Sequence, residues 1–273
     1  MTEIPRLRLE ELLIEAELTN KRHIIVEGPT DKLFVEGWSM DVSAADLVIV
    51  TDVESIEIDP GLLYMAGLND GNRSRVLVVA RHAATQGIDI RCIADRDCGH
   101  GVDEHSCDAL LWTDYPSLES YAVDVATLDR ANVLGFAGKL PAAADYLPGL
   151  TFALRETYCV RVHNEHLPSP DFESGFASQA RDFFDFRVEE SVAHDLRADI
   201  ATYERPAGDD GRQFAYGHDI AGLMLAVYAN VLKNQAGLRT REAVENVLRG
   251  AIQVVGSYRS EGLFSALEQW VKC

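Results

Sequence analysis

The sequence has few basic residues and no long apolar run. It contains 25 Lys and Arg against 44 Asp and Glu in 273 residues, a formal net charge of −19. Because no run of about 18 apolar residues is present, the chain is not expected to span a membrane. The start, Met-Thr-Glu-Ile-Pro-Arg, has no apolar signal region, and the five cysteines follow no regular spacing. We therefore expect a cytoplasmic protein with reduced thiols and no membrane partner.

The shortage of Lys and Arg also bears on nucleic-acid binding, which these residues largely provide. Three interpretations stay open: a local basic patch in an acidic whole, a partner protein that carries the substrate, or no nucleic-acid binding. There is no Gly-rich P-loop ending in Lys-Ser/Thr, so an autonomous ATPase is not expected. The 47% hydrophobic content suffices for a large core in one elaborated domain or two small ones.

Two short segments carry the clearest chemistry. Residues 24–31 are Ile-Ile-Val-Glu-Gly-Pro-Thr-Asp, and residues 92–97 are Cys-Ile-Ala-Asp-Arg-Asp. Each is a short apolar run, typical of a buried parallel strand, that ends in acidic residues. Such strand ends meet at one edge of a sheet, where open α/β folds place their sites. Grouped carboxylates repel one another, and Mg²⁺ (or Mn²⁺) is the cation expected to relieve this repulsion at an all-oxygen site.

Strands and helices alternate at short spacing in the first part of the chain, which predicts an α/β fold with a mainly parallel sheet flanked by helices. The expected strands cover 23–27, 46–58, 88–95 and 109–113, and the expected helices 6–19, 31–38 and 72–86. Helical periodicity dominates later, in 125–135, 141–162, 173–203, 215–235, 239–255 and 260–272. We therefore expect an α/β core over 1–125, a helical C-terminal region over 126–273, and a mobile surface loop at 206–213.

These motifs resemble the TOPRIM domain, which topoisomerases, primases and overcoming-lysogenization-defect (OLD) nucleases share. Val26-Glu-Gly-Pro-Thr-Asp31 and the strand ending Asp95-Arg-Asp97 carry the resemblance, over about residues 20–125. Trp112-Thr-Asp-Tyr-Pro-Ser-Leu-Glu-Ser-Tyr121 and Gly217-His-Asp219 are similar to an uncharacterised TOPRIM-like family of bacterial anti-phage systems. That family is often found beside an ABC-type ATPase. The resemblance implies a TOPRIM-like core, a nucleic-acid substrate and an ATPase partner, and it leaves a homodimer open.

The resemblance also implies roles for the acidic residues. Glu27 would bind metal or act as the general acid/base. Asp95 and Asp97 would be catalytic and bind metal. Residues two apart on an extended strand point to the same face, so both carboxylates could bind one cation. The alternative is a turn after the strand, where Asp is common. Asp31, otherwise a helix cap, and Glu119, otherwise an acid favoured in a first helical turn, would be further metal ligands. Asp114 is a weaker candidate.

Other polar residues have competing interpretations. His218 is a catalytic candidate, as proton donor or phosphate contact, or an ordinary polar residue beside a capping Asp219. The aromatic residues of 181–187 could stack bases, although their spacing favours a core or an interface. Four residues have the side chains of zinc ligands, but their spacing matches no familiar signature and zinc is not expected: Cys98, His100, His105 and Cys107.

Together these features predict a Mg²⁺-dependent nuclease that cuts DNA or RNA, tRNA included, as the effector of an anti-phage system. Water would attack phosphorus while Glu27 assists proton transfer. Two alternatives stay open. One is a TOPRIM binding module, non-catalytic or latent, that an ATPase partner controls. The other is a nucleotidyl transferase.

Overall fold

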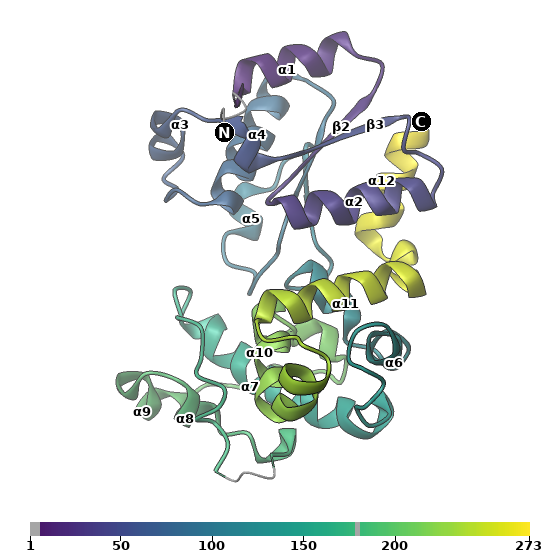
Figure 1. The fold of residues 1–273 in the computed structure, drawn as a ribbon. Helices are drawn as coiled ribbons and strands as arrows, with labels where there is room; N and C mark the ends of the chain where they lie inside the picture. Colours follow the sequence, from purple (N-terminus) through teal and green to yellow (C-terminus); the bar gives the residue numbers. More distant parts are fainter. Residues whose placement is uncertain (1–5, 178–180) are drawn as a thin grey trace. The chain divides into compact units, whose positions relative to one another are not determined.

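The computed structural model describes residues 6–177 and 181–273, which form two compact units (Figure 1). Unit 1 contains the chain up to Asp95, together with Gly101–Asp114 and Arg259–Cys273. Unit 2 contains Arg96–His100 and Tyr115–Tyr258. The chain therefore leaves unit 1 and returns to it at the C-terminus, whereas the sequence predicted a single division near residue 125. Residues 1–5, part of the segment judged to lack a signal region, lie outside the description.

Unit 1 is built on a four-stranded sheet in the order β3-β2-β5-β6, and all neighbouring strands in it are parallel. Ile24 pairs with Val50, and Ile25 pairs with Cys92. The strand order reverses between β2 and β5, because the chain adds β3 on one side of β2 and then returns to its other side. The strands are β2 (Arg22–Val26), β3 (Val48–Asp52), β5 (Arg91–Ala94) and β6 (Leu110–Trp112).

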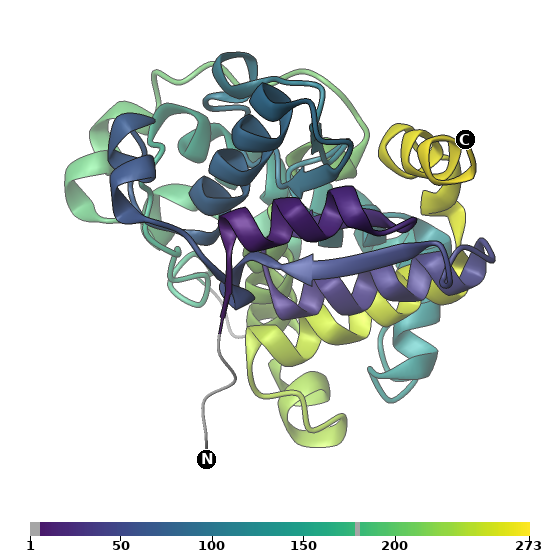
Figure 2. The same ribbon diagram turned by 90° about the horizontal axis from the view of Figure 1, so that it is seen from above.

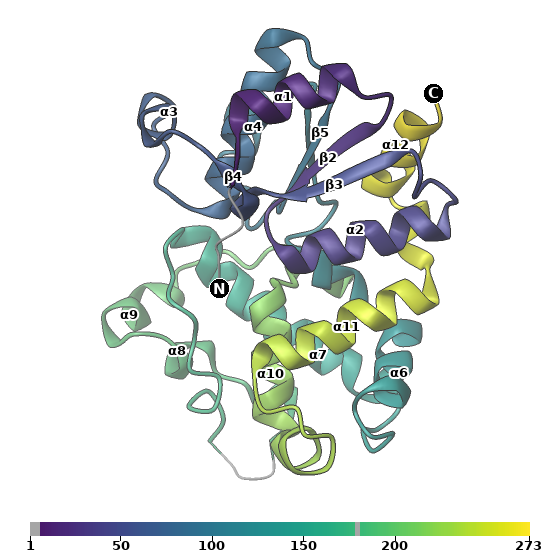
Figure 3. The same cartoon turned by 45° about the horizontal axis from the view of Figure 1, so that its top comes forward.

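Helices cover both faces of this sheet, which confirms the predicted α/β class. In Figures 1 and 3, α1 (Leu9–Leu18) and α4 (Asn72–Gln86) lie on one face, and α2 (Pro29–Asp41) lies on the other with α12 (Gly262–Lys272). Figure 2 shows β3 between α1 and α2. On the second face, the ring of Phe264 lies 5.8 Å from that of Phe34 and 6.0 Å from that of Trp38. All three side chains are buried.

The strand expected over 46–58 is interrupted. β3 ends at Asp52, whose carboxylate accepts the Ser55 N–H at 3.1 Å and closes a 3₁₀ turn. The chain then forms β4 (Ile56–Glu57), which pairs in parallel with β1 (Leu7–Arg8) in a separate two-stranded sheet. Unit 1 also contains two short helices, α3 (Pro60–Met65) and α5 (Val102–His105).

Unit 2 is helical. α11 packs against α6, α10 and the 3₁₀ segment Leu118–Ala122, and α7 packs against α6 and α10. The main helices are α6 (Val125–Leu134), α7 (Ala143–His163), α10 (Gly217–Val227) and α11 (Arg241–Val255), with a π-helical turn at Asn230–Gln235. Throughout residues 6–177 and 181–273, every helix is too short or too polar to cross a bilayer.

The long helix expected over 173–203 is wrong for the residues described. This stretch contains only short pieces, α8 (Val188–Ser191), α9 (Arg197–Ile200) and two 3₁₀ turns, at Phe183–Asp185 and His194–Leu196. Asp182 stops one possible helix, because its side chain accepts the Phe184 N–H at 2.9 Å and caps a single turn. Residues 178–180, which the expected helix included, lie outside the description.

Candidate metal and catalytic site

Glu27 and Asp95 follow neighbouring strands of unit 1. β2 ends at Val26 and β5 at Ala94, so the two acidic residues begin the loops at the carboxyl edge of the sheet. These strands flank the reversal of strand order, where open α/β sheets form their ligand crevice. Oε1 of Glu27 accepts the Asp95 N–H at 2.8 Å. The Glu27 carboxylate is therefore held at the end of β5, as the two sequence motifs predicted.

The turn after β2 follows from its composition. Gly28 is the N-cap of α2 in extended conformation, and Pro29 takes the first helical position, where its missing N–H costs nothing. Oδ2 of Asp31 accepts the Gly28 N–H at 3.1 Å. Asp31 is therefore a capping residue, the alternative that the sequence left open, and its role as a metal ligand stays a prediction.

Asp97 does not continue β5. The strand ends at Ala94, and Asp97 has a left-handed backbone with φ +51°, while its N–H donates to the Pro116 carbonyl at 2.9 Å. The expected extended Asp-x-Asp with both carboxylates on one strand face is thus not formed, and the turn alternative is observed. Asp tolerates this conformation better than most residues. Asp97 belongs to unit 2 and Asp95 to unit 1.

Glu119 lies within unit 2 and forms an ion pair there. Its side chain is 4% exposed and pairs with the Arg249 guanidinium of α11. It also packs against the backbone of Gly217, where a Cβ would lie 2.3 Å from Glu119 Oε2. The structure thus supplies Glu119 with a cation from the protein itself, and its predicted metal binding stays a prediction.

His218 begins α10 beside the same ion pair. Its Nδ1 lies 2.7 Å from Oε1 of Glu245 on α11. This hydrogen bond raises the pKa of His218, and the charges of Glu245, Glu119 and Asp219 act in the same direction. His218 therefore has a carboxylate partner, and its imidazole keeps a proton to higher pH than a free histidine does. Of the predicted site residues, unit 2 brings Glu119 and His218 together. Unit 1 joins Glu27 to Asp95 through a hydrogen bond, while Asp31 caps Gly28, the residue after Glu27.

Asp219 has a different role from the cap that the sequence suggested. It is buried and forms a bidentate ion pair with Arg161 of α7, at 2.6 Å to Nε and 2.7 Å to Nη2. The Arg161 guanidinium lies over the ring of Tyr216, 4.3 Å from its centroid. Asp219 therefore holds α10 to α7.

Sequence reasoning missed three partners of these residues, Arg161, Glu245 and Arg249. Two of them carried a visible signal. Glu245 and Arg249 lie four residues apart on a helix whose buried face is otherwise apolar, with Val244, Leu248 and Ile252. A charged pair among such positions indicates buried counter-ions. No local pattern marks Arg161, because its partner Asp219 lies 58 residues away.

The remaining candidates have structural contacts. Asp114 accepts the Leu263 N–H at 3.1 and 3.2 Å and so caps α12. His105 Nδ1 lies 3.2 Å from Arg81 Nη2 in unit 1, and burial followed by the Arg81 charge lowers the pKa of His105. Of the other residues with zinc-type side chains, Cys107 belongs to unit 1, and Cys98 and His100 belong to unit 2.

The acidic residues at the sheet edge fit Mg²⁺ or Mn²⁺ in kind. Within the described ranges, no three His, Cys, Asp or Glu side chains are grouped so as to form a complete protein cage for an ion. Mg²⁺ commonly binds through one or two carboxylates and completes its shell with water and substrate phosphates. Glu27 and Asp95 provide two carboxylates of this kind from adjacent strand ends.

Comparison with known proteins adds no assignment. The sequence matches no protein-family model and no curated protein.

Proposed function

We propose that this chain is a Mg²⁺- or Mn²⁺-dependent nuclease that hydrolyses phosphodiester bonds of DNA or RNA. The observation that carries the proposal is the position of Glu27 and Asp95 at the reversal of strand order, with Glu27 fixed by the Asp95 N–H. A TOPRIM-like core, an effector role in anti-phage defence and an ABC-type ATPase partner are part of the same proposal. These rest on the resemblance of the sequence motifs.

A divalent cation bound at this edge would stabilise charge on the phosphate oxygens and make a nearby water more acidic. Glu27 would take the proton of the attacking water at a carboxylate oxygen. Its bond to the Asp95 N–H directs the carboxylate before substrate arrives, and such preorganisation limits the cost of reaching the reactive geometry. Asp95 would hold the cation through its own carboxylate.

His218 stays a predicted phosphate contact or proton donor in unit 2. A raised pKa suits both roles, because a protonated imidazole attracts phosphate and can protonate a leaving oxygen. If it has either role, His218→Gln lowers the turnover rate of cleavage and shifts the basic limb of the pH–rate profile. An unchanged pH–rate profile would show that His218 takes no part in cleavage and serves only as the partner of Glu245.

The test uses the purified protein with plasmid DNA, total RNA and tRNA, each with Mg²⁺, Mn²⁺ or EDTA. Glu27→Gln is the sharpest variant, because its amide oxygen can still accept the Asp95 N–H while the proton-accepting carboxylate is lost. We expect metal-dependent cleavage that falls by about 100-fold or more in Glu27→Gln, the scale of general acid–base catalysis. Asp95→Asn should lose cleavage as well.

Two matched controls separate catalysis from general charge. Glu57→Gln and Asp46→Asn remove one exposed carboxylate each from the same unit, and both should cleave like the parent protein. Circular dichroism and thermal unfolding establish that all variants fold. Cleavage that resists EDTA, or that survives Glu27→Gln in full, would refute the proposal.

The charge of −19 favours one second candidate, a latent module controlled by a partner. A chain with such a surplus of carboxylates repels nucleic acid at long range, and a basic partner would remove that barrier. In this case the isolated protein cleaves nothing, yet it binds Mn²⁺ and loses that binding in Asp95→Asn. A nucleotidyl transferase would instead incorporate labelled nucleotides into a product.

A further inference from the structure

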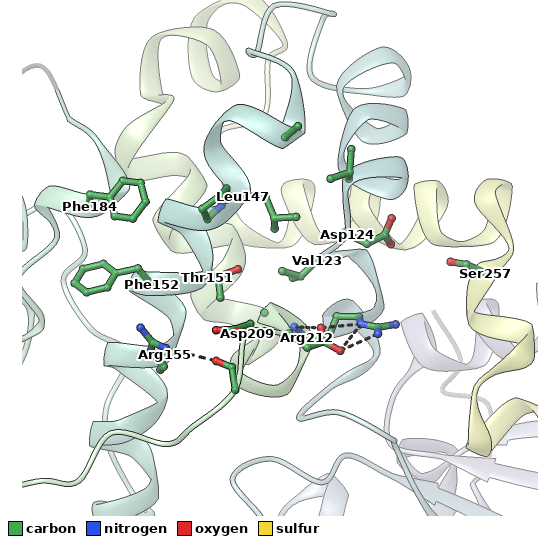
Figure 4. A pocket seen from close by; sticks show the side chains of 16 residues that line it. Val123, Asp124, Leu147, Thr151, Phe152, Arg155, Phe184, Asp209, Arg212 and Ser257 are labelled. Carbon is green, nitrogen blue, oxygen red and sulfur yellow. Dashed lines mark hydrogen bonds and ion pairs between the residues drawn. The ribbon is translucent and has the colours of Figure 1, made fainter.

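Unit 2 contains a cavity of about 760 Å³ that is open to solvent and is lined by none of the acidic residues discussed above (Figure 4). It lies between α7 and the loop of residues 208–212. Its volume falls within the usual range for sites of small organic ligands, about 300–1,000 Å³. All its lining residues belong to unit 2, so the cavity is complete within one compact part of the chain.

The wall formed by α7 is largely apolar and ends in a cation. Leu147, Thr151, Phe152 and Arg155 follow one another at spacings of four, one and three, and therefore share one side of the helix. Phe184 joins them from the 3₁₀ turn, with its ring 6.0 Å from that of Phe152 at 35°. Figure 4 shows both rings and Arg155 along the same side of the cavity.

Phe184 is unusual among the phenylalanines of segment 181–187. Phe183 and Phe186 are buried in the core, whereas Phe184 is 58% exposed. An aromatic ring that borders a cavity and is open to solvent offers a face for stacking a planar group. The base-stacking role considered for this segment is therefore available to Phe184 in particular.

The opposite wall is a loop with a defined backbone. At Gly211 a Cβ would lie 2.5 Å from Thr151 Oγ1, so only glycine lets the loop approach α7 this closely. Gly208 has φ +130°, which side chains disfavour. Asp210 and Arg212 pair with each other in bidentate fashion, with Nη2 2.8 Å from Oδ2. Asp209 takes no part in these contacts, and Arg155 adds only one long hydrogen bond to the loop, at the Gly208 carbonyl.

Arg155 and Asp209 are the charged groups of this cavity that the fold leaves available. Across the described ranges, no carboxylate lies within ion-pair distance of Arg155. Its one hydrogen bond to these residues, from Nη1 to the Gly208 carbonyl, is 3.5 Å long. Its buried Nε has no hydrogen-bond partner among them. Asp209 is exposed at the same loop and makes no hydrogen bond to the described residues. An anionic group could accept hydrogen bonds from Arg155, and hydroxyl groups could donate hydrogen bonds to Asp209.

We propose that this cavity binds a nucleoside monophosphate. The base stacks on Phe152 and Phe184, as bases do on aromatic side chains. The phosphate accepts hydrogen bonds from Arg155, whose planar guanidinium matches phosphate geometry. The ribose hydroxyls donate to the Asp209 carboxylate, a contact that acidic residues make in dinucleotide sites.

Charge limits the ligand to a single phosphate. The cavity is lined by three carboxylates, of Asp124, Asp209 and Asp210, and two guanidiniums, of Arg155 and Arg212. Arg212 is already paired with Asp210, so one cation remains for the ligand. Each added phosphate would bring more negative charge toward uncompensated carboxylates. We therefore expect a nucleoside triphosphate to bind more weakly than the monophosphate.

The test is calorimetric titration of the full chain with AMP, GMP, CMP and UMP. Using Glu27→Gln protein in EDTA removes metal-assisted binding at the sheet edge, so the result does not depend on the proposed nuclease activity. We expect at least one nucleotide to bind with Kd below about 1 mM, within the range of weak specific sites. The matching nucleoside and ribose 5-phosphate should each bind at least about tenfold more weakly, because each lacks one of the contacts.

Two variants assign the contacts, and a third is the control. Arg155→Ala should raise Kd about tenfold or more through the loss of a charged hydrogen bond. Phe184→Ser should raise it about five- to tenfold by loss of stacking, and since Phe184 is exposed this change spares the core. Arg197→Ala removes a half-buried guanidinium that pairs with Glu190, away from the cavity but in the same unit, and should leave Kd unchanged.

Two results would overturn the proposal. One is the absence of saturable binding for all four monophosphates. The other is binding that Arg155→Ala and Phe184→Ser both leave unaltered.

Discussion

Glu245 is a buried carboxylate whose partner, His218, has a side chain that is 64% exposed. The pair stabilises the buried Glu245 carboxylate only while the His218 imidazole carries a proton. The hydrogen bond to Glu245 raises the pKa of His218, so protonation and folding are linked. Because folding raises the pKa of His218, the pair contributes its full stabilisation below the ordinary histidine pKa of about 6.5, where the imidazole is protonated in both the folded and the unfolded chain. It is lost as pH rises through the higher value in the folded protein.

The pair therefore predicts a pH-dependent effect of Glu245→Gln. We expect this variant to lose more free energy of unfolding relative to the parent at pH 6 than at pH 9. The difference should be on the order of 0.5 kcal/mol, since water screens the exposed imidazole. Urea unfolding at both pH values measures it. Glu242→Gln, an exposed change on the same helix, is the control, and an equal loss at both pH values would contradict the linkage.

At the residue scale, the sequence predicted the position of side chains that directly follow a strand. Glu27 and Asp95 were predicted to lie together, and adjacent parallel strands bring them into contact through a hydrogen bond. For Asp97 the sequence left an extended strand and a turn open, and it could not decide between them, because one left-handed residue is enough to redirect the chain after β5. The ion pair of Asp219 depends on Arg161, 58 residues away, and leaves no local signal, whereas Arg249, the partner of Glu119, is marked only by its charge beside the apolar face of its helix.

α12 is the element that closes unit 1. Its apolar face buries Phe264 against Phe34 and Trp38 of α2. Its Trp270 lies beneath the guanidiniums of Arg22 and Arg91, at 5.3 and 4.8 Å from the ring centroid. The start of the helix is fixed by Asp114, which follows β6 and accepts the Leu263 N–H. The C-terminal helix is therefore tied to the sheet at both of its ends.

The cap at the start of α12 should contribute measurably to stability. Asp114→Ala leaves the first N–H groups of the helix without this acceptor, and we expect a loss of about 1 kcal/mol in the free energy of unfolding. Asp114→Asn keeps a side-chain acceptor and should recover most of it. Chemical denaturation of the three proteins measures the effect, and equal stability of Asp114→Ala and the parent would contradict the capping role.

Elements with strong local signals were predicted well. The helix expected over 72–86 coincides with α4, which ends at Gly87 with φ +72° because glycine adopts the left-handed cap readily. The expected strand over 46–58 failed at Asp52, where a side-chain cap outweighs β propensity and the following residues pair with β1. The helix expected over 173–203 failed because its aromatic residues pack into the core at irregular spacing, with Phe183 and Phe186 buried and Phe184 exposed.

Across the whole molecule, acidic residues outnumber basic ones by 44 to 25. Folding brings these like charges closer together, so their repulsion works against the compact state. The repulsion is long-ranged, and salt shortens its range to about 8 Å at physiological ionic strength. The buried ion pairs described above are much less sensitive to salt than the exposed carboxylates.

The protein should therefore become more stable when salt is added at pH 7. We expect NaCl to raise the midpoint of thermal unfolding by a few degrees, equivalent to about 1 kcal/mol for a chain of this size. The rise should be nearly complete by about 0.2 M, where screening is already strong. Sucrose at matched osmolarity provides the uncharged control. A midpoint that stays constant, or that rises linearly to high salt, would show that charge repulsion is not the cause.

Unit 2 interrupts unit 1 between Asp114 and Arg259, and this order matters during synthesis. When the ribosome has made the sheet and all of unit 2, the apolar side chains of Phe34 and Trp38 still lack Phe264. The helix that covers them, α12, is translated only after all of unit 2. A nascent chain that has not yet reached α12 thus carries Glu27 and Asp95 on a sheet whose α2 still exposes the apolar side chains that Phe264 later covers.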